Sequence, residues 1–326
     1  MVKNNGSHFS FMVQAGPSIG AGHLFRSLTF AKCLKRKGCI IHWITNEHAG
    51  DVLHQMNERA AIYRDIFDPR MLDRLPQTDC FFVDSYLPSI NYLVMLKDKA
   101  PLVIMDDFRD RPVEEIADVL INYNLGADTI PYKKRKDQLR LLGPQYAFIR
   151  EDYWSVEAED RGYCLFASGA SDILNVSQSM VQMWDSQWLP LVIVVGPMVS
   201  KAQRSHIETL SAAKSNVAVV YAPPDFPSLV AKARFVICTS SVTAYEALSV
   251  QKPISVFQVA DNQVLVGEAI EARGVGRNLG FWGTWGTADL KKVVVAPLVP
   301  PPLVVNRYGA ELTAEILTKW LGGERK

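Results

Sequence analysis

A histidine and an arginine in a glycine-rich turn are the strongest sign of chemistry in this sequence. The turn follows an apolar run at 9–13, which predicts a strand. It leads into an apolar three-and-four pattern at 24–34, which predicts a helix. His23 therefore stands where a strand gives way to a helix, and Arg26 lies one turn further along that helix. An imidazole at this place can act as a general base, and the fixed charge of Arg26 can point toward the same ligand.

Several interpretations of this turn stay open on its residues alone. Gly16, Gly20 and Gly22 tolerate unusual backbone angles and let a ligand come close, which is typical of phosphate binding. Their spacing is not that of a dinucleotide-binding motif, and no lysine stands in phosphate-loop position. A purely structural turn, with His23 capping a helix, is the alternative.

Length and composition indicate a two-domain globular protein. The 326 residues exceed the size at which a single core stops growing, and 48% hydrophobic with 21% charged residues is ordinary for a globular chain. A formal net charge of +1 does not indicate binding to nucleic acid. The basic run 133–136 predicts a solvent-exposed loop or helix face. Five cysteines without a C-x-x-C pair indicate buried free thiols, and the six histidines show no metal-ligand spacing. We expect neither a metal nor a cofactor.

Membrane insertion is not expected either. No apolar run reaches the roughly eighteen residues that span a bilayer. The polar start at 1–8 lacks the apolar region of a signal peptide, and four prolines in the apolar segment 293–305 argue against a membrane helix there. We predict a cytoplasmic protein whose oligomeric state stays open, with a monomer favoured.

Strand-like and helix-like stretches alternate along the chain, which predicts an α/β protein with two doubly wound, Rossmann-like parallel sheets. A charged and aromatic stretch at 150–162 marks the boundary between an N-terminal domain, 1–155, and a C-terminal domain, 156–326. The last helix, expected at 310–321, is a candidate for packing back on the first domain. Ligands bind such sheets at the carboxyl ends of the strands, and we expect a cleft between the domains. The predicted strands are 9–13, 39–45, 80–84, 102–107, 119–124, 141–144, 163–167, 191–195, 217–220, 235–238 and 254–257.

Hydroxyl side chains gather after one buried strand of the second half, at 239–243. This run also opens a helix, so its free amides and the hydroxyls of Ser240, Ser241 and Thr243 suit a diphosphate without a metal. The alternative is that Ser241 or Thr243 only caps the helix.

Two further features of the second half fit a nucleotide. Glu246, one turn into that helix, can accept two hydrogen bonds from a ribose diol, and the alternative is a solvated helix residue. The loop 168–172, which begins with Ser168 and Gly169, can close over the same diphosphate.

A series of motifs, in this order, resembles the UDP-sugar hydrolases of pseudaminic acid biosynthesis. They are G-A-G-H-x-x-R at 20–26, V-D-S-Y at 83–86, M-D-D at 105–107, L-L-G-P-x-Y-A-x-x-R at 141–150, the loop 168–172, the segment 239–246 and A-D-N-Q at 260–263. The resemblance covers 9–280. It implies the two-domain GT-B fold and the release of UDP from a 2,4-diacetamido-2,4,6-trideoxyhexose. Water would attack the anomeric carbon with inversion.

The resemblance also implies roles for single residues. His23 would be the catalytic base, and Tyr86 and Asn262 would complete the catalytic group in the sugar cleft. The residues expected to contact the sugar or the nucleotide are Gly20, Gly22, Arg26, Asp107, Ser168, Gly169, Tyr221, Ala222, Ser240, Ser241, Thr243, Glu246 and Gln263. Where the family has paired glycines in its two phosphate loops, this chain has Ser-Gly-Ala and Ser-Ser, whose hydroxyls could replace an amide contact.

Other bases and other functions remain open on the sequence. Asp84 and Asp107 are the alternative bases, but a lone carboxylate needs a raised pKa to act near pH 7. A GT-B glycosyltransferase with a UDP-sugar donor is the alternative enzyme, although the polar segment 47–51 offers no surface for a lipid acceptor. An inactive nucleotide-sugar-binding protein is the alternative outside enzymes.

Overall fold

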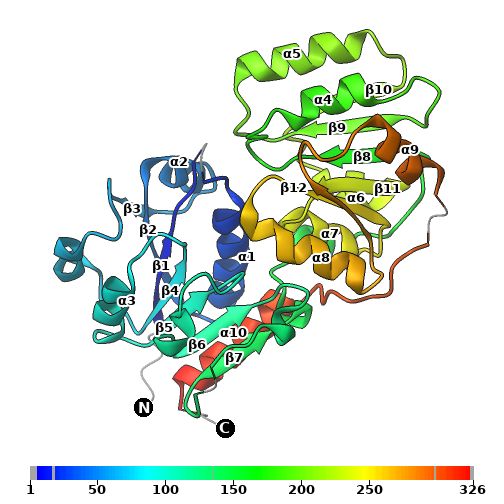
Figure 1. Ribbon diagram of the computed structural model, residues 1–326. Helices are drawn as coiled ribbons and strands as arrows, with labels where there is room; N and C mark the ends of the chain where they lie inside the picture. Colours follow the sequence, from blue (N-terminus) through cyan, green and yellow to red (C-terminus); the bar gives the residue numbers. More distant parts are fainter. Residues whose placement is uncertain (1–5, 17–18, 134, 297–298, 324–326) are drawn as a thin grey trace. The chain divides into compact units, whose positions relative to one another are not determined.

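The computed structural model describes residues 6–16, 19–133, 135–296 and 299–323 (Figure 1). The predictions that fall on 1–5, 17–18, 134 and 297–298 lie outside the described residues. The chain divides into two compact units, unit 1 with Met1–Phe148 and Tyr308–Lys326, and unit 2 with Ile149–Arg307. No helix in the described part of the chain is both long and apolar enough to cross a bilayer.

Within the described residues, unit 1 is built on a seven-stranded parallel sheet in the order β3-β2-β1-β4-β5-β6-β7. The order reverses between β1 and β4, and in doubly wound sheets this is the place where ligands bind. The strands are β1 (His8–Val13), β2 (Ile40–Thr45), β3 (Ala60–Ile62), β4 (Cys80–Asp84), β5 (Leu102–Met105), β6 (Val119–Asn122) and β7 (Leu139–Leu142). The helices are α1 (Gly22–Arg36), α2 (Glu47–Gln55), α3 (Ile90–Lys97) and α10 (Gly309–Leu321).

Alternate residues of the central strands pack against helices on the two faces of this sheet. On one face the rings of Phe11 of β1 and Phe82 of β4 contact at a tilt, with centroids 4.5 Å apart, and Phe30 of α1 packs against both. On the other face Val83 of β4 lies in one core with Leu93 of α3. Helix α1 is therefore fixed directly behind the ends of β1 and β4.

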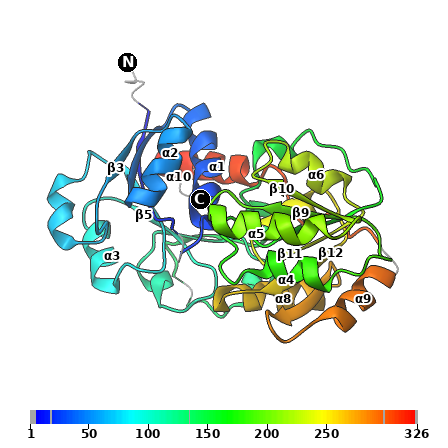
Figure 2. The same ribbon diagram turned by 90° about the horizontal axis from the view of Figure 1, so that it is seen from above.

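The C-terminal helix α10 belongs to unit 1, where it packs against α1 (Figures 1 and 2). Glu311 accepts a hydrogen bond from Arg36 of α1 at 2.7 Å. At Gly309 an added Cβ would lie 2.4 Å from the backbone oxygen of Ala147, so only glycine permits this close approach.

Unit 2 contains, among its described residues, a six-stranded parallel sheet in the order β10-β9-β8-β11-β12-β13. Its order reverses between β8 and β11, so unit 2 has a switch point of its own. The strands are β8 (Cys164–Ala167), β9 (Leu191–Val195), β10 (Val217–Tyr221), β11 (Phe235–Thr239), β12 (Ile254–Gln258) and β13 (Arg277–Phe281). The helices are α4 (Val176–Met183), α5 (Lys201–Ala212), α6 (Phe226–Lys232), α7 (Val242–Ser249), α8 (Val264–Ala272) and α9 (Thr287–Val295).

The predicted fold class, two doubly wound parallel sheets, is confirmed, and each predicted strand is present to within two residues at either end. The five cysteines are buried and free, as predicted. Among the helices and strands of the described residues, β3, α8, β13 and α9 were not predicted. Strand β13 contains Gly280 at φ +90 and pairs with β12 in a shifted register, so it lacks the apolar run of the other strands.

Candidate active site

The turn before His23 is closed by two backbone hydrogen bonds between Gly16 and Gly20, at 3.1 and 2.7 Å. Gly20 has φ +80, a conformation that side chains other than glycine rarely adopt. Helix α1 then begins at Gly22, after the N-cap residue Ala21, whose methyl group cannot accept a hydrogen bond. His23 thus lies in the first turn of α1, where the sequence predicted that a strand gives way to a helix. The sheet order places this turn at the switch point of unit 1.

His23 forms a close pair with Asp84, the last residue of β4. The Nδ1 atom of His23 lies 2.6 Å from Oδ1 of Asp84. The Asp84 side chain is fully buried, whereas 13% of the His23 side chain is exposed. Asp84 reaches this place because β4 lies beside β1 in parallel register, with Asp84 opposite Val13 at the ends of both strands.

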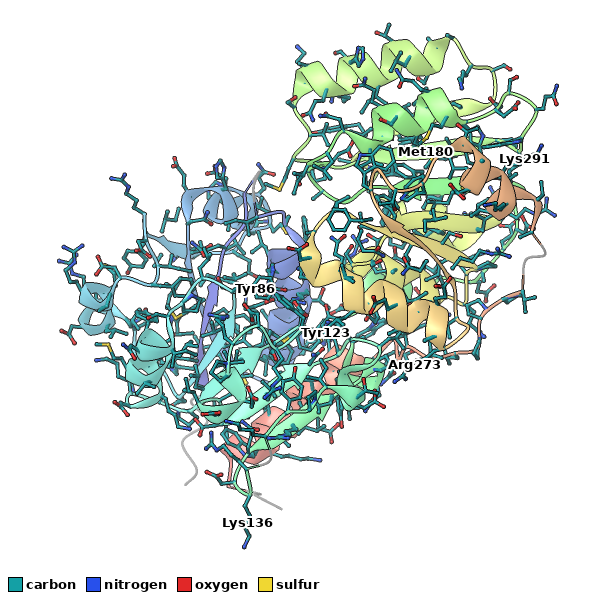
Figure 3. All side chains as sticks on the ribbon, in the orientation of Figure 1. Tyr86, Tyr123, Lys136, Met180, Arg273 and Lys291 are labelled. Carbon is teal, nitrogen blue, oxygen red and sulfur yellow. The ribbon has the colours of Figure 1, made fainter. Side chains whose placement is uncertain are left out.

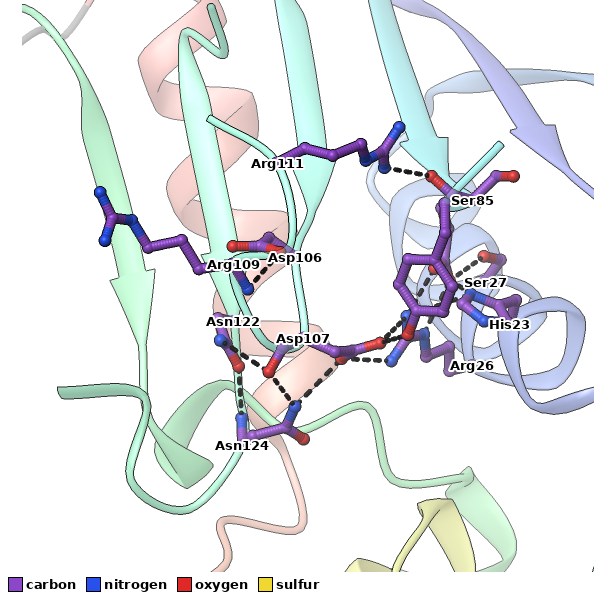
Figure 4. A network of polar contacts seen from close by, with 12 residues as sticks. His23, Arg26, Ser27, Ser85, Asp106, Asp107, Arg109, Arg111, Asn122 and Asn124 are labelled. Carbon is purple, nitrogen blue, oxygen red and sulfur yellow. Dashed lines mark hydrogen bonds and ion pairs between the residues drawn. The ribbon is translucent and has the colours of Figure 1, made fainter. Parts of the chain in front are cut away.

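Arg26 joins Asp84 to a second carboxylate, that of Asp107. Figure 4 shows the contacts between Arg26 and Asp107. Its Nε and Nη2 donate to Asp84 at 2.7 and 2.5 Å, and its Nη1 and Nη2 donate to Asp107, both at 2.9 Å. Burial alone would raise the pKa of each aspartate. The Arg26 guanidinium, helped by His23, holds the pKa of Asp84 well below its usual range and lowers that of Asp107. Both carboxylates are therefore ionised at neutral pH.

The ionised state of Asp84 determines which nitrogen of His23 carries a hydrogen. A carboxylate can only accept, so at 2.6 Å the Nδ1 atom of His23 must donate. Arg26 Nη2 lies farther from the same nitrogen, at 3.2 Å, and is itself a donor, so the shorter contact decides. Within the described part of the chain the hydrogen bonds of His23 involve Nδ1 alone, which leaves Nε2 of a neutral ring able to accept a proton.

Tyr86 and Asn124 approach Asp107 from the loops after β4 and β6. The Tyr86 hydroxyl donates to Oδ2 of Asp107, and Nδ2 of Asn124 donates to Oδ1 at 3.1 Å. The Tyr86 ring stands edge-on to the His23 ring, with centroids 4.8 Å apart. Tyr123, labelled beside Tyr86 in Figure 3, packs under the Arg26 guanidinium at 5.6 Å. Asp107 therefore fixes Tyr86 against the imidazole.

Asp106, next to Asp107, has a different environment. Its Oδ2 accepts a hydrogen bond from the Tyr132 hydroxyl at 2.6 Å, and its Oδ1 accepts one from the backbone N–H of Arg109 at 3.1 Å. Burial raises the pKa of Asp106 to about 6, because these two neutral donors offset the loss of water only in part. Of the two neighbours, Asp106 is therefore the one that takes up a proton more readily as the pH falls below 7.

The serine-rich turn of unit 2 lies after β11, at the switch point of that sheet. Ser241 is the N-cap residue of α7, but its hydroxyl pairs with Thr239 Oγ1 at 2.8 Å. The Ser240 hydroxyl accepts from Gln258 at 2.8 Å and lies 3.3 Å from the backbone oxygen at 257. Thr243 follows in the first turn of α7. Because the Ser240 hydroxyl is held inside the sheet, this serine does not crowd the loop.

Glu246 is a buried residue of α7, 3% exposed, so the alternative of a solvated helix residue is wrong. Its Oε1 accepts from Nε of Arg150 at 2.7 Å, and its Oε2 lies 3.4 Å from the Tyr153 hydroxyl. Burial lowers the pKa of Arg150, but the Glu246 carboxylate raises it above its ordinary value, so the pair is ionic.

The loop after β8 is shaped by its own side chains. Asp172 accepts hydrogen bonds from the backbone N–H groups of Val176 and Ser177, at 2.9 and 3.1 Å, and so holds the start of α4 at Val176. The Ser168 hydroxyl pairs with that of Ser177 at 3.0 Å, and Gly169 takes φ +93. Ser168 and Gly169 thus stand at the switch point beside the α7 turn.

The remaining predicted residues lie at other strand ends of unit 2. Tyr221 ends β10, is 41% exposed and donates to the backbone oxygen of Pro197 at 3.0 Å. Ala222 follows with φ +40. Asn262 and Gln263 lie in the short 3-10 helix Asp261–Gln263 after β12, where Gln263 accepts a backbone hydrogen bond at 2.9 Å.

Several residues of these networks had no assigned role in the sequence, among them Arg111, Tyr132 and Arg150. Arg111 donates to the backbone oxygens of Ser85 and Pro88 and so fixes the loop that carries Tyr86. Tyr132 stands beside the basic run, with no pattern that points to Asp106. Of these residues, only Arg150 had a signal in the sequence that could have pointed to a role in the site, because it is the last residue of the motif at 141–150.

Comparisons with known proteins give a fold but no family. No protein-family profile matches the sequence, and no curated protein matches it either. Solved structures match over nearly the whole chain. MurG of Acinetobacter baumannii superposes with a TM-score of 0.63 at 13% identity, over 97% of this chain and 99% of that chain. The chain has the GT-B fold.

Two further solved structures also match over nearly the whole chain. CalG4, the calicheamicin glycosyltransferase, matches with a TM-score of 0.64 at 14% identity, over 98% of both chains. S. aureus MnaA in complex with UDP matches with a TM-score of 0.64 at 12% identity, over 97% of both chains. At such identities the GT-B likeness establishes the architecture alone.

Proposed function

We propose that this protein is a nucleotide-sugar hydrolase. It releases UDP from a UDP-linked 2,4-diacetamido-2,4,6-trideoxyhexose, a step in the biosynthesis of a nonulosonic acid such as pseudaminic acid. The observation that carries the proposal is the His23–Asp84 pair at the switch point of unit 1. The motif resemblance and the likeness to a UDP-bound structure of the same fold support the substrate class.

His23 supplies the proton acceptor in this mechanism. Nε2 takes a proton from water while Nδ1–H stays bonded to the Asp84 carboxylate, which stabilises the imidazolium as it forms. The water oxygen attacks C1 of the sugar from the face opposite UDP. The bond from C1 to the phosphate oxygen breaks, and its electron pair leaves with UDP. The anomeric centre is inverted, and the proton on Nε2 returns to solvent.

The leaving diphosphate needs charge stabilisation rather than a proton at neutral pH. In unit 2 the backbone N–H groups at the start of α7 and in the loop after β8 would bind the diphosphate, because helix N-termini and successive N–H groups attract anions. Glu246 would receive the ribose diol, and Tyr221 with Ala222 would border the base. Tyr86, fixed by Asp107, and Asn262 would contact the sugar.

A glycosyltransferase is the second candidate, favoured by one observation. Similar structures include named glycosyltransferases such as CalG4. A base at Nε2 could equally take the proton from a sugar or alcohol hydroxyl. The two functions differ only in the nucleophile, so the dependence on an added acceptor separates them.

The test is an NMR assay of UDP release from a panel of UDP-sugars, each with and without an added acceptor. We expect free UDP and free sugar in buffer alone, fastest with the 2,4-diacetamido-2,4,6-trideoxyhexose. His23→Asn keeps a donor near the position of Nδ1 but removes Nε2, and should lower the rate about 10²- to 10⁴-fold. His206→Asn, on the exposed side of α5, is the matched control. Release that requires an acceptor would establish a transferase instead.

A further inference from the structure

Two ionised carboxylates from different strands share one buried cation in unit 1. Asp84 ends β4, and Asp107 follows β5. The side chains of Arg26, Asp84 and Asp107 are exposed by only 7%, 0% and 8%. Two buried carboxylates at one site cannot both stay ionised without a cation between them. The charge state of this cluster therefore depends on Arg26.

Each carboxylate holds an aromatic ring of the candidate site. Asp84 accepts from Nδ1 of His23 at 2.6 Å, and Asp107 accepts from the Tyr86 hydroxyl. Figure 4 shows the resulting line of contacts, which runs from His23 through the guanidinium of Arg26 to Asp107. The two rings meet at its ends, 4.8 Å apart.

We propose that Arg26 is a positioning residue, which keeps Asp84 and Asp107 ionised and so sets the tautomer of His23 and the place of Tyr86. The notion that its charge points at the ligand fits the contacts less well. All three of its nitrogens donate to the two carboxylates, and Tyr123 covers the guanidinium. The effect on catalytic rate rests on the proposed hydrolase function, whereas the effect on His23 does not.

An arginine suits this place better than a lysine. Four contacts of 2.5 to 2.9 Å need the planar fork of a guanidinium, and a single ammonium cannot serve both carboxylates with the same geometry. Arg26→Lys thus keeps the positive charge but weakens the bridge. Arg36→Lys is the matched control, because Arg36 lies on the same helix and pairs with Glu311 at a more exposed place.

The first experiment is ¹⁵N NMR of the histidine rings in the full-length protein without substrate. We expect the wild type and Arg36→Lys to show the neutral form of His23 with its hydrogen on Nδ1. Arg26→Lys should show a mixture of the two neutral ring forms. Asp107→Asn should leave His23 unchanged but shift the ¹³C signal of the Tyr86 ring, because it removes only the second half of the bridge. Unchanged His23 signals in Arg26→Lys would overturn the proposal.

The second experiment is steady-state kinetics with the UDP-sugar that the wild type hydrolyses. Arg26→Lys should lower kcat about 10- to 100-fold with little change in KM, as loss of an orienting group does. Its pH–rate profile should shift as well. A large rise in KM with unchanged kcat and unchanged ¹⁵N signals would make Arg26 a substrate contact and refute the positioning role. If the wild type hydrolyses no UDP-sugar, the proposed function fails, but the ¹⁵N result still decides the role of Arg26.

Discussion

Asp84→Asn is the substitution whose effects follow most directly from the contacts. Asp84 accepts hydrogen bonds from His23 at 2.6 Å, from Arg26 at 2.7 and 2.5 Å, and from Ser27 at 3.1 Å. Asparagine keeps the shape but loses the charge and one acceptor oxygen. It can also donate to Nδ1 of His23, and this would place the ring hydrogen on Nε2, where the base is needed.

Two magnitudes follow from the loss of this carboxylate. Breaking a buried ion pair by removing one partner costs about 3–5 kcal/mol, and we expect the lower end because Asp107 still pairs with Arg26. Loss of the correct tautomer should remove the base contribution, a decrease in kcat of about 10²- to 10⁴-fold. Urea unfolding measures the first quantity, and UDP release measures the second.

The pH dependence of the Asp84→Asn effect has a definite sign. The folded-state pKa of Asp84 lies below the value of about 3.9 in an unfolded chain. Its contribution to stability is therefore fully present above about pH 4 and is lost as the pH falls through the folded-state pKa. The difference in unfolding free energy between wild type and variant should narrow below that pH. Asp73→Asn, at a side chain 93% exposed, is the control. A variant with wild-type stability and a rate within about threefold of wild type would show that Asp84 neither stabilises this cluster nor sets the tautomer of His23.

The remaining predictions concern other buried contacts. Asp106 has a folded-state pKa of about 6, so its ionisation between pH 4 and pH 7 destabilises the folded wild type. The unfolding free energy of Asp106→Asn should therefore rise relative to that of the wild type by about 2–3 kcal/mol from pH 4 to pH 7. Urea unfolding at both pH values tests this. Glu246→Gln should weaken UDP binding about 10- to 100-fold in calorimetry, since hydrogen bonds to a charged group contribute roughly 1.5–3 kcal/mol. Glu208→Gln on α5 should leave UDP binding unchanged. Gly309→Ala should destabilise the protein by about 1–3 kcal/mol, because its Cβ would lie 2.4 Å from a backbone oxygen, whereas Gly286→Ala, with open space around the Cβ, should be nearly neutral.

Much of the fold could be predicted because local patterns report burial. Continuous apolar runs gave the strands of both sheets, and the three-and-four spacing gave α1 with its buried face. The position of His23 at a strand end followed from the same patterns. The elements that were not predicted have weak sequence patterns. Gly280 interrupts the apolar residues of β13, and the apolar end of α9 is continuous in sequence with the proline-rich segment.

The contacts inside the site depend on tertiary structure instead. Arg26 meets Asp84 and Asp107 across 58 and 81 residues of sequence, and no spacing rule connects them. The side chain of Ser240 points to Gln258 because β12 lies beside β11, which the turn alone does not reveal. Glu246 looked solvated or ribose-bound, and its burial against Arg150 became visible only once unit 2 was folded.

The most direct test of the hydrolytic mechanism is the fate of solvent oxygen. The protein is incubated with the UDP-sugar in ¹⁸O-labelled water, and the UDP formed is observed by ³¹P NMR. Attack of water on C1 leaves every phosphate oxygen unlabelled, so we expect UDP without an isotope shift. The wild type should form this UDP far faster than His23→Asn. An ¹⁸O-shifted β-phosphate signal would place the attack on phosphorus and rule out attack of water on C1.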